Sequence, residues 1–323
     1  MKYYLGIDGG GTKTKFTLCT ASGTYINSYI GKTCHYLQCG FDGLAEIIRD
    51  GIVQITKEAG LEPSDIAFAF AGCPGYGDVA SDEAEIRASI DSGMGEIPHA
   101  IGNDCENALA AGIGNRVGIN IIAGTGSVGC GINEHGDYER CGGWHHALGG
   151  DEGSGYWIGL RLLKEFQRQS DGRDEKTLLY DTVRSALDLR SDGEIVTRVV
   201  KEWNLDRTKI ASLAPLCLSI CNEGDPFAKA ILADAASELA DLAISLYRRL
   251  KFSDIDIPVS GTGGIFKMGA AITEPFSIIL KINGMNYVKP ILEPDMGAVF
   301  LAIKKAGLKT GEDVIKEMIT SSL

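Results

Sequence analysis

Tyr3-Tyr4-Leu5-Gly6-Ile7-Asp8-Gly9-Gly10-Gly11-Thr12-Lys13-Thr14 is the stretch that decides the fold. Residues 3–7 are apolar and β-prone, three glycines interrupt them, and residues 15–19 alternate polar with apolar. This pattern predicts a β-hairpin with a glycine turn. It recurs as an apolar strand over 118–123, the turn Gly124-Thr125-Gly126-Ser127 and a return strand over 128–133. Two halves that open with the same hairpin indicate an ancient duplication.

Helical and strand patterns alternate after each hairpin, which predicts an α/β fold. We expect a helix around 44–55, a buried strand over 66–71, a helix near 84–90, a strand over 99–102, a helix through 108–111, a long helix that begins at Asp225-Pro226, strands at 257–259 and 291–292, and a closing helix over 297–308. At roughly 150 residues per domain, the 323 residues predict two domains. We place them at 1–112 and 113–296, with the closing segment (about 297–323) packing back on the first.

Composition excludes several classes of partner. The 31 basic and 43 acidic residues give a formal charge of −12, which is the opposite of the basic surface that binds nucleic acid or anionic lipid. The sequence contains no apolar run of the ~20 residues that span a bilayer. Nine cysteines occur without a Cys-x-x-Cys pair, and scattered free thiols are typical of a reducing compartment. We therefore expect a cytoplasmic protein.

The two glycine turns carry the first chemical signal. Glycines let a turn expose successive backbone N–H groups, which together form an anion site, and hydroxyls at Thr12, Thr125 and Ser127 add donors for phosphate oxygens. Asp8, at a strand end beside such a turn, could hold Mg²⁺ through water. The alternative is that glycine only makes each turn tight. Two turns with matching chemistry favour phosphate.

Other nucleotide and hydrolase motifs fit less well. Gly124-x-Gly126-x-x-Gly129 matches the dinucleotide fingerprint, but that motif needs a helix to follow, and residues 128–133 resemble a strand. The Walker string and the Gly-x-Ser-x-Gly motif are absent from the sequence. A Rossmann cofactor, a P-loop NTPase and a serine hydrolase are therefore disfavoured.

Asp104 has two interpretations. It follows a predicted strand and precedes a predicted helix, where Asp is a good N-cap. At a strand end it could instead be a general base that accepts the proton of a substrate hydroxyl. On this residue alone the N-cap is favoured.

The segment from Cys141 to Gly159 is the most informative stretch. Trp144 lies among glycines and histidines, outside any apolar periodicity, and Asp151 with Glu152 supplies carboxylates. An aromatic face with carboxylate hydrogen bonds is typical of a sugar site. Both acids also precede a helix, where they would stabilise its N-terminus. Zinc at Cys141, His145 and His146 lacks an evident fourth ligand.

These motifs resemble those of the BadF/BadG/BcrA/BcrD-type ATPase family, and within it the N-acetylglucosamine kinase-like branch of the sugar kinase, Hsp70 and actin superfamily. The resemblance rests on residues 6–14, 103–104, 123–127, 142–144 and 150–155, with weaker agreement at 211–215, 261–266 and 297–302. It implies two RNase H-like, actin-like ATPase domains with ATP and substrate in a cleft between them. A homodimer is compatible with it.

The family assigns roles residue by residue. The resemblance implies ATP binding by Gly10, Gly11, Thr12, Lys13, Thr125, Ala211 and Gly264, Mg²⁺ at Asp8, and Asp104 as the base that activates a sugar 6-hydroxyl. It implies sugar contacts from His35, Asp104, Ser127, Val128, Gly143, Trp144, His145 and Asp151. The cofactors would be ATP and Mg²⁺, and the substrate an amino sugar such as N-acetylglucosamine or glucosamine.

Three departures from the family pattern stand out. His35 occupies the position of a sugar-site Asn, one extra residue lies between Trp144 and Asp151, and Gly264 with Met268 replaces serines near the adenine. The first two bear on which sugar is bound.

Two other functions compete with a hexosamine 6-kinase. The first is an ATPase that activates a 2-hydroxyacyl-CoA dehydratase-like partner through an iron–sulfur cluster, but Cys105 and Cys130 are not in the cluster contexts of such activators. The second is a sugar-sensing protein without catalysis, which the retention of Asp8, Thr12, Asp104 and Thr125 disfavours.

Overall fold

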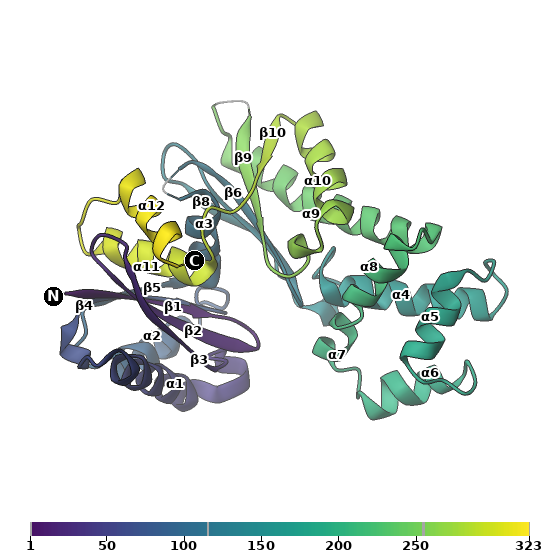
Figure 1. Cartoon of the computed structure of the whole chain (residues 1–323), viewed down its shortest axis with the longest axis horizontal. Coiled ribbons are helices and arrows are strands. Elements are labelled where there is room, and N and C mark those ends of the chain that lie inside the picture. Colours follow the sequence, from purple (N-terminus) through teal and green to yellow (C-terminus); the bar gives the residue numbers. More distant parts are fainter. Residues whose placement is uncertain (1, 115, 254–255, 323) are drawn as a thin grey trace. The chain divides into compact units, whose positions relative to one another are not determined.

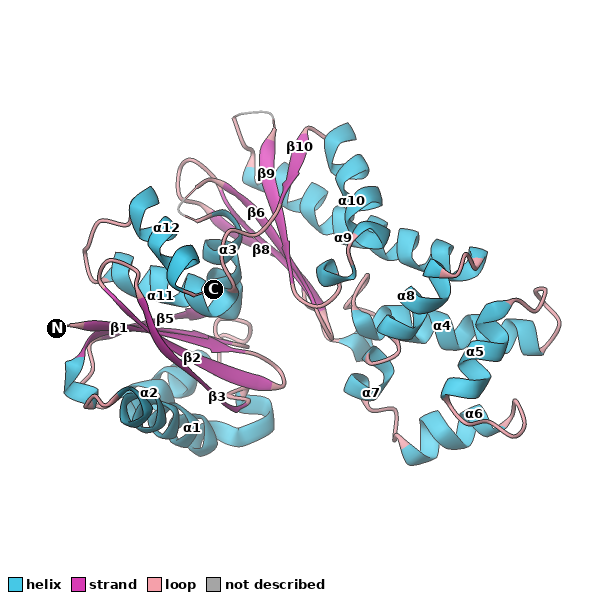
Figure 2. Ribbon diagram, in the orientation of Figure 1, coloured by secondary structure: helices cyan, strands magenta, loops and turns pink. Residues whose placement is uncertain are grey.

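The computed structural model describes residues 2–114, 116–253 and 256–322. It divides into two compact units, Met1–Arg116 with Lys289–Leu323, and Val117–Val288. Each unit contains one five-stranded mixed sheet with helices packed against it (Figures 1 and 2). None of the helices in these three ranges is long and apolar enough to cross a bilayer.

The sheet of the first unit has the order β3-β2-β1-β4-β5. Its strands are β1 (Tyr3–Gly9), β2 (Lys13–Thr20), β3 (Tyr25–Lys32), β4 (Ile66–Cys73) and β5 (His99–Asn103). The pairs β1–β2 and β2–β3 are antiparallel, and the pairs β1–β4 and β4–β5 are parallel. The β1–β2 register ends with Gly9 opposite Thr14, which confirms the first hairpin and its glycine turn.

Helices pack on both faces of this sheet. They are α1 (Tyr36–Ala59), α2 (Glu83–Met94), α3 (Asp104–Ile113), α11 (Pro294–Lys305) and α12 (Glu312–Ser321), with a short 3₁₀ turn η1 (Pro63–Asp65). Leu5 and Ile7 share a core with α1 and α2, whereas Tyr4 packs with α3, α11 and α12. Neighbouring strand residues point to opposite faces, so β1 is buried from both sides.

Gly6 shows why β1 needs a small residue at its centre. A Cβ at this position would lie 2.4 Å from Val299 N and 2.7 Å from Asp295 O of α11. The strand and the helix therefore approach too closely for any side chain at this position, and α11 packs directly on the strand that carries Asp8.

The second unit repeats the topology of the first. Its strands are β6 (Gly118–Ala123), β7 (Ser127–Ile132), β8 (Tyr138–Gly142), β9 (Ile257–Thr262) and β10 (Met285–Val288), in the order β10-β9-β6-β7-β8. The β6–β7 and β7–β8 pairs are antiparallel, and the β6–β9 and β9–β10 pairs are parallel. The same order and senses occur in both sheets, as a duplication requires. The turns after β1 and β6 therefore occupy equivalent places.

Most helices of the second unit lie between β8 and β9 in the chain. They are α4 (Gly155–Ser170), α5 (Leu178–Ala186), α6 (Glu194–Val196), the π-helical η3 (Thr197–Glu202), α7 (Arg207–Ala211), α8 (Ala214–Asn222) and α9 (Pro226–Leu250); η2 (His146–Leu148), η4 (Phe266–Met268) and α10 (Ala270–Ile282) complete the set. Asp225 Oδ1 accepts from Phe227 N (2.9 Å) and Ala228 N (3.0 Å), which confirms the predicted start of the long helix. Figure 1 shows α9 beside the sheet.

Two expectations for the C-terminal region need correction. Ile291 and Leu292 form no strand, because their N–H groups both donate to the carbonyl of Ala111 at 3.0 and 2.9 Å. The closing segment forms two helices, α11 and α12, instead of one. The units divide after Arg116, and residues 289–296 belong to the first unit, where Leu292 joins its core.

Candidate functional site

The predicted site residues fall into one set in each unit. The first unit carries Asp8, Gly10, Gly11, Thr12, Lys13, His35 and Asp104, and the second carries Thr125, Ser127, Val128, Gly143, Trp144, His145, Asp151, Ala211 and Gly264. Each set includes residues in or beside the turn of that unit's first hairpin. The two sets are described separately below.

Hydrogen bonds from neighbouring side chains hold the first turn, and the residues at its tip are exposed. Gly10 N donates to Lys13 O at 2.9 Å, Thr33 Oγ1 donates to Gly10 O at 2.7 Å, and Gln38 Nε2 donates to Gly11 O at 2.9 Å. Residues 11–13 are exposed. Thr33 and Gln38 thus donate hydrogen bonds to two carbonyl oxygens of the turn, while the tip of the turn is exposed to solvent.

Neither backbone conformation nor packing requires glycine at three positions: Gly11 and Gly264 of the predicted nucleotide set, and Gly124 of the second turn. Gly11, Gly124 and Gly264 lie outside the left-handed φ region, and a Cβ at each would meet nothing within 4 Å. A tight turn therefore does not require them. Bare backbone with open space in front is what close approach of a ligand to the peptide N–H groups needs.

Asp8, the last residue but one of β1, lies in a desolvated, anionic environment. Asn107 Nδ2 donates to its Oδ1 at 2.9 Å. The pKa of Asp8 is raised to about 7, chiefly by burial and also by the charges of Asp104 and Asp295, while the Asn107 hydrogen bond and Lys15 act in the opposite direction. Three carboxylates with one ammonium group leave an excess of negative charge, which a divalent cation would neutralise.

The donor set fits Mg²⁺ better than a metal held by protein ligands alone. Among the residues described, no cluster of three or more His, Cys, Asp or Glu side chains could hold a metal ion. Mg²⁺ commonly takes only one or two carboxylates and completes its shell with water and substrate phosphates. Asp8 beside an open glycine turn supplies such a carboxylate.

Asp104 is the first residue of α3 and not its N-cap, which corrects the N-cap interpretation. The cap is Asn103, whose Oδ1 accepts from Cys105 N at 3.0 Å. Glu106 Oε1 accepts from Asn103 N at 3.1 Å and completes a capping box. Capping therefore does not account for Asp104, whose charge acts on Asp8.

His35 is the N-cap of α1. Its Nδ1 accepts from Leu37 N at 3.4 Å, and its ring stacks on that of Tyr36 with centroids 5.7 Å apart. The ring therefore supports the loop before α1.

The second turn is held by the start of α4. Gly155 N donates to Gly124 O at 2.8 Å, and Tyr156 N donates to Thr125 O at 3.2 Å. A Cβ on Gly155 would lie 3.4 Å from Ala211 Cβ, so α7 ends beside the turn. Ile265 N donates to Ala123 O at 3.0 Å, which places the Gly264 loop at the same end of β6. The structure thus brings Thr125, Ala211 and Gly264 together.

The acid of the predicted sugar segment is inaccessible. Asp151 is 3% exposed, whereas Trp144 is 75% exposed. Asp151 Oδ2 lies 2.7 Å from Arg207 Nη2, and its Oδ1 accepts from Ser127 N at 3.2 Å. Ser127 Oγ donates to Glu152 O at 2.6 Å. Asp151 and Ser127 are therefore both hydrogen-bonded to protein groups.

Gly143, Trp144 and His145, which belong to the same segment, are exposed on the second unit. Val128 pairs with Gly142, and Gly143 has a φ of 75°, so the chain leaves β8 through two left-handed glycines. The rings of His145 and His146 lie 4.2 Å apart. Burial, His145 and Arg207 lower the pKa of His146.

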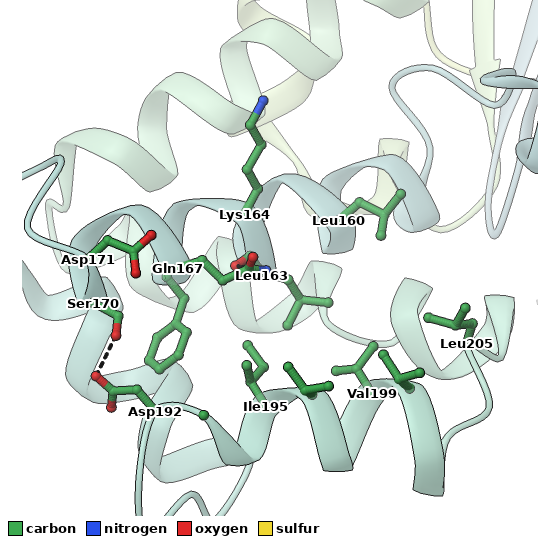
Figure 3. A pocket seen from close by; sticks show the side chains of 14 residues that line it. Leu160, Leu163, Lys164, Gln167, Ser170, Asp171, Asp192, Ile195, Val199 and Leu205 are labelled. Carbon is green, nitrogen blue, oxygen red and sulfur yellow. Dashed lines mark hydrogen bonds between the residues drawn. The ribbon is translucent and has the colours of Figure 1, made fainter.

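A separate hollow of about 560 Å³ lies between α4 and the α6–η3 helices (Figure 3). Leu163 of α4 lines one side and Ile195 and Val199 of the α6–η3 helices line the other, and at one end Ser170 Oγ donates to Asp192 Oδ2 at 2.6 Å. None of the predicted site residues is among those that line it in the described part of the unit.

Comparison with known proteins places this geometry in context. The model of the BadF/BadG/BcrA/BcrD ATPase family matches residues 5–302. An N-acetylmuramic acid/N-acetylglucosamine kinase from Clostridium acetobutylicum is 30% identical over 285 residues, or 88% of this chain and 92% of the relative. An N-acetyl-D-glucosamine kinase from Dictyostelium discoideum is 29% identical over 312 residues, or 93% and 97%.

A solved structure agrees over nearly the whole chain. It comes from Chromobacterium violaceum, and its assignment as an N-acetylglucosamine kinase is provisional. The TM-score is 0.74 at 25% identity, and the match covers 93% of this chain and 99% of the other. The two-sheet α/β architecture is therefore shared with this structure.

Proposed function

Because the chain belongs to the BadF/BadG/BcrA/BcrD ATPase family, we propose that it is an ATP-dependent amino-sugar kinase that phosphorylates a sugar 6-hydroxyl group. One observation carries most of the proposal. The equivalent hairpin turns of the two units each contain a glycine, Gly11 and Gly124, that neither its φ angle nor its packing requires. Asp8 and Asp104 lie beside the first of these turns. The relatives that act on amino sugars support the substrate class.

The nucleotide would be bound by residues of both turns. Gly10, Gly11, Thr12 and Lys13 would contact phosphate oxygens from the first unit, and Thr125 from the second. Ala211 and Gly264, which lie at the same end of β6 as Thr125, would line the nucleotide pocket. Backbone N–H groups and hydroxyls at such turns donate hydrogen bonds that stabilise phosphate charge.

Asp8 would hold Mg²⁺ through water. When bound, the ion would neutralise charge on the transferred phosphoryl group. The excess of carboxylates around Asp8 favours such a cation, and Lys15, which pairs with Asp295 at 2.9 Å, leaves that excess in place.

Asp104 would accept the proton of the attacking sugar hydroxyl. A general base must be ionised and within hydrogen-bond reach of that hydroxyl when substrate is bound. Asp104 is the first residue of α3, and Asn103 is the N-cap of that helix. Orientation and charge neutralisation would supply most of the acceleration, as in other phosphoryl transfers.

The sugar would contact the exposed residues of the second unit and the loop before α1. Trp144 offers an aromatic face, with Val128, Gly143 and His145 beside it, and His35 occupies the position of the family's Asn. Ser127 and Asp151 lie behind this surface and would shape it.

The test is coupled ADP release across a panel of amino sugars and hexoses, with the phosphorylated position of the product assigned by NMR. We expect formation of a 6-phosphate with N-acetylglucosamine or glucosamine, dependence on Mg²⁺, and no product from Asp104→Asn. ATP hydrolysis without sugar phosphate on any member of the panel would contradict the proposal.

A further inference from the structure

Two side chains outside the glycine motif hold the first turn. Thr33 lies in the loop before α1, and Gln38 lies in the first turn of that helix. Thr33 Oγ1 donates to Gly10 O at 2.7 Å, and Gln38 Nε2 donates to Gly11 O at 2.9 Å. Two consecutive carbonyl groups of the turn therefore point toward the same loop and helix start.

These hydrogen bonds also set the direction of two backbone N–H groups. In a trans peptide the C=O of one residue and the N–H of the next point in opposite directions, and the described part of the chain contains no cis peptide bond. Gly10 O is directed at Thr33, so the N–H of Gly11 points away from the loop. Gly11 O is directed at Gln38, so the N–H of Thr12 points away from it as well. Successive N–H groups on one side of a turn form an anion site.

The tip of the turn leaves room for a ligand at these groups. Residues 11–13 are exposed, and a Cβ on Gly11 would meet nothing within 4 Å. Gly10 N, by contrast, donates to Lys13 O at 2.9 Å and closes the turn. The N–H groups of Gly11 and Thr12 are therefore the ones that a phosphate group at the tip would meet.

The Thr33 hydroxyl is itself fixed by the loop. It accepts from His35 N at 3.1 Å while it donates to Gly10 O. Cys34 is 1% exposed, and its N–H donates to Thr14 Oγ1 at 2.9 Å. The loop is thus bonded to the turn at Gly10 and to β2 at Thr14, which keeps the Thr33 hydroxyl in place.

We infer that Thr33 and Gln38 are positioning residues for nucleotide binding: they orient the N–H groups of the first turn toward the phosphates. This inference rests on the proposed use of ATP, and the ligand class is a nucleoside triphosphate. Both side chains act through the backbone of the turn, so their loss should weaken the binding of phosphate and leave the binding of the nucleoside part unchanged. Removal of one such hydrogen bond should weaken phosphate binding about threefold to tenfold.

The test compares a fluorescent ATP analogue with the nucleoside that carries the same fluorophore and no phosphate. Thr33→Val removes the hydroxyl and keeps the shape of the side chain, and Gln38→Met removes the amide donor and keeps the length. Each variant is expected to raise the Kd of the ATP analogue about threefold to tenfold, with the Kd of the nucleoside changed less than about twofold. Urea unfolding establishes that each variant is folded.

Two further substitutions separate the hydrogen bonds from general effects of mutation. Thr33→Ser keeps the hydroxyl and should hold the Kd of the ATP analogue within about twofold of the wild type. Gln54→Met is the matched control for Gln38→Met, because Gln54 is an exposed glutamine of the same helix. It should leave the Kd unchanged. If Thr33→Val or Gln38→Met fails to fold, the other variant still tests the inference.

Three results would overturn the inference. The first is an unchanged Kd of the ATP analogue in either Thr33→Val or Gln38→Met when the variant is folded. The second is an equal loss of affinity for the nucleoside, which would mean that the substitutions disturb the nucleotide site as a whole. The third is a wild-type protein that does not bind the ATP analogue, which would also remove the proposed function. Because the third result appears in the wild type and the first two only in the variants, the two failures are distinguishable.

Discussion

Asn107 holds Asp8. Its Nδ2 donates to Asp8 Oδ1 at 2.9 Å and to Ile7 O at 3.2 Å, so a fully buried amide from α3 fixes the end of β1. Gly72 makes room for this side chain, since a Cβ there would lie 2.1 Å from Asn107 Nδ2. The acid beside the first turn is thus oriented by a helix and two strands.

Asn107→Asp should destabilise the first unit. The change removes the donor and places a second carboxylate against Asp8 in a desolvated environment, where we expect a loss of ~1–3 kcal/mol or more in the free energy of unfolding. Urea unfolding at neutral pH measures it. Asn286→Asp, at an exposed position of β10, is the control and should change stability by less than ~0.5 kcal/mol. Equal effects of the two substitutions would contradict the role given to Asn107.

Gly6→Ala and Gly11→Ala should have opposite consequences. At Gly6 the new Cβ would meet backbone atoms of α11 at 2.4 and 2.7 Å, so we expect overpacking to cost ~1–3 kcal/mol of stability. At Gly11 the Cβ meets nothing within 4 Å, so stability should hold while the affinity for ATP falls at least about tenfold. Urea unfolding and nucleotide titration of both variants measure the two effects. Unimpaired ATP binding in Gly11→Ala would remove the first turn from the nucleotide site.

Asp104→Asn should abolish phosphoryl transfer and leave the fold intact. Asn cannot accept the proton of the sugar hydroxyl. The α3 cap belongs to Asn103, so the substitution leaves it in place. Asn103→Ala is the complementary variant, expected to lose ~1 kcal/mol of stability through the cap. Initial rates and urea unfolding separate the two roles, and transfer near the wild-type rate in folded Asp104→Asn would exclude it as the base.

Glu106→Gln should change how stability depends on pH. Burial raises the pKa of Glu106 above its ordinary value, with the Asn103 N–H and Lys305 acting in the opposite direction. A raised folded-state pKa favours the protonated form, so Glu106 contributes stability below its unfolded pKa and loses it as pH rises through the folded pKa. Gln can still accept from Asn103 N, and the variant should therefore gain stability relative to wild type between pH 4 and pH 8. Parallel urea unfolding at both pH values is the measurement, and a constant difference would contradict it.

Local patterns predicted the strands and turns because they are encoded in neighbouring residues. The glycines after Asp8 and Ala123 mark both hairpins, and the Asp225-Pro226 cap marks α9. The α3 cap was assigned one residue late, since Asn and Asp both suit an N-cap and only the hydrogen bond to Cys105 N decides between them.

Long-range pairs could not be predicted in this way. Arg207 and Asp151 are 56 residues apart, and Arg207 belongs to no motif, so their ion pair becomes evident only when α7 packs beside the turn. Ile291 and Leu292 are apolar and β-prone, yet the carbonyl of Ala111 takes both of their N–H groups. In each case tertiary contacts override the local preference.

His35→Asn tests whether the departure from the family pattern sets the choice of sugar. Asn offers one acceptor and two donors, which can pair with both partners of an amide substituent, whereas a neutral His offers one donor and one acceptor on a larger ring. The substitution should preserve the start of α1. His35 caps this helix through Nδ1, and Asn is among the best N-cap residues. Loss of the stacking on Tyr36 is the remaining change.

If His35 faces the substrate, His35→Asn should raise kcat/KM for N-acetylglucosamine relative to glucosamine by roughly tenfold, which corresponds to ~1.4 kcal/mol. The control is His135→Asn, an exposed histidine in the turn after β7, which should leave the ratio unchanged. Urea unfolding should show His35→Asn to be as stable as the wild type, so that a change in the ratio reports on recognition. An unchanged ratio in the stable variant would mean that His35 serves only the loop and the α1 cap. Discrimination between the two sugars would then be sought in the segment from Trp144 to Asp151, where the chain carries its extra residue.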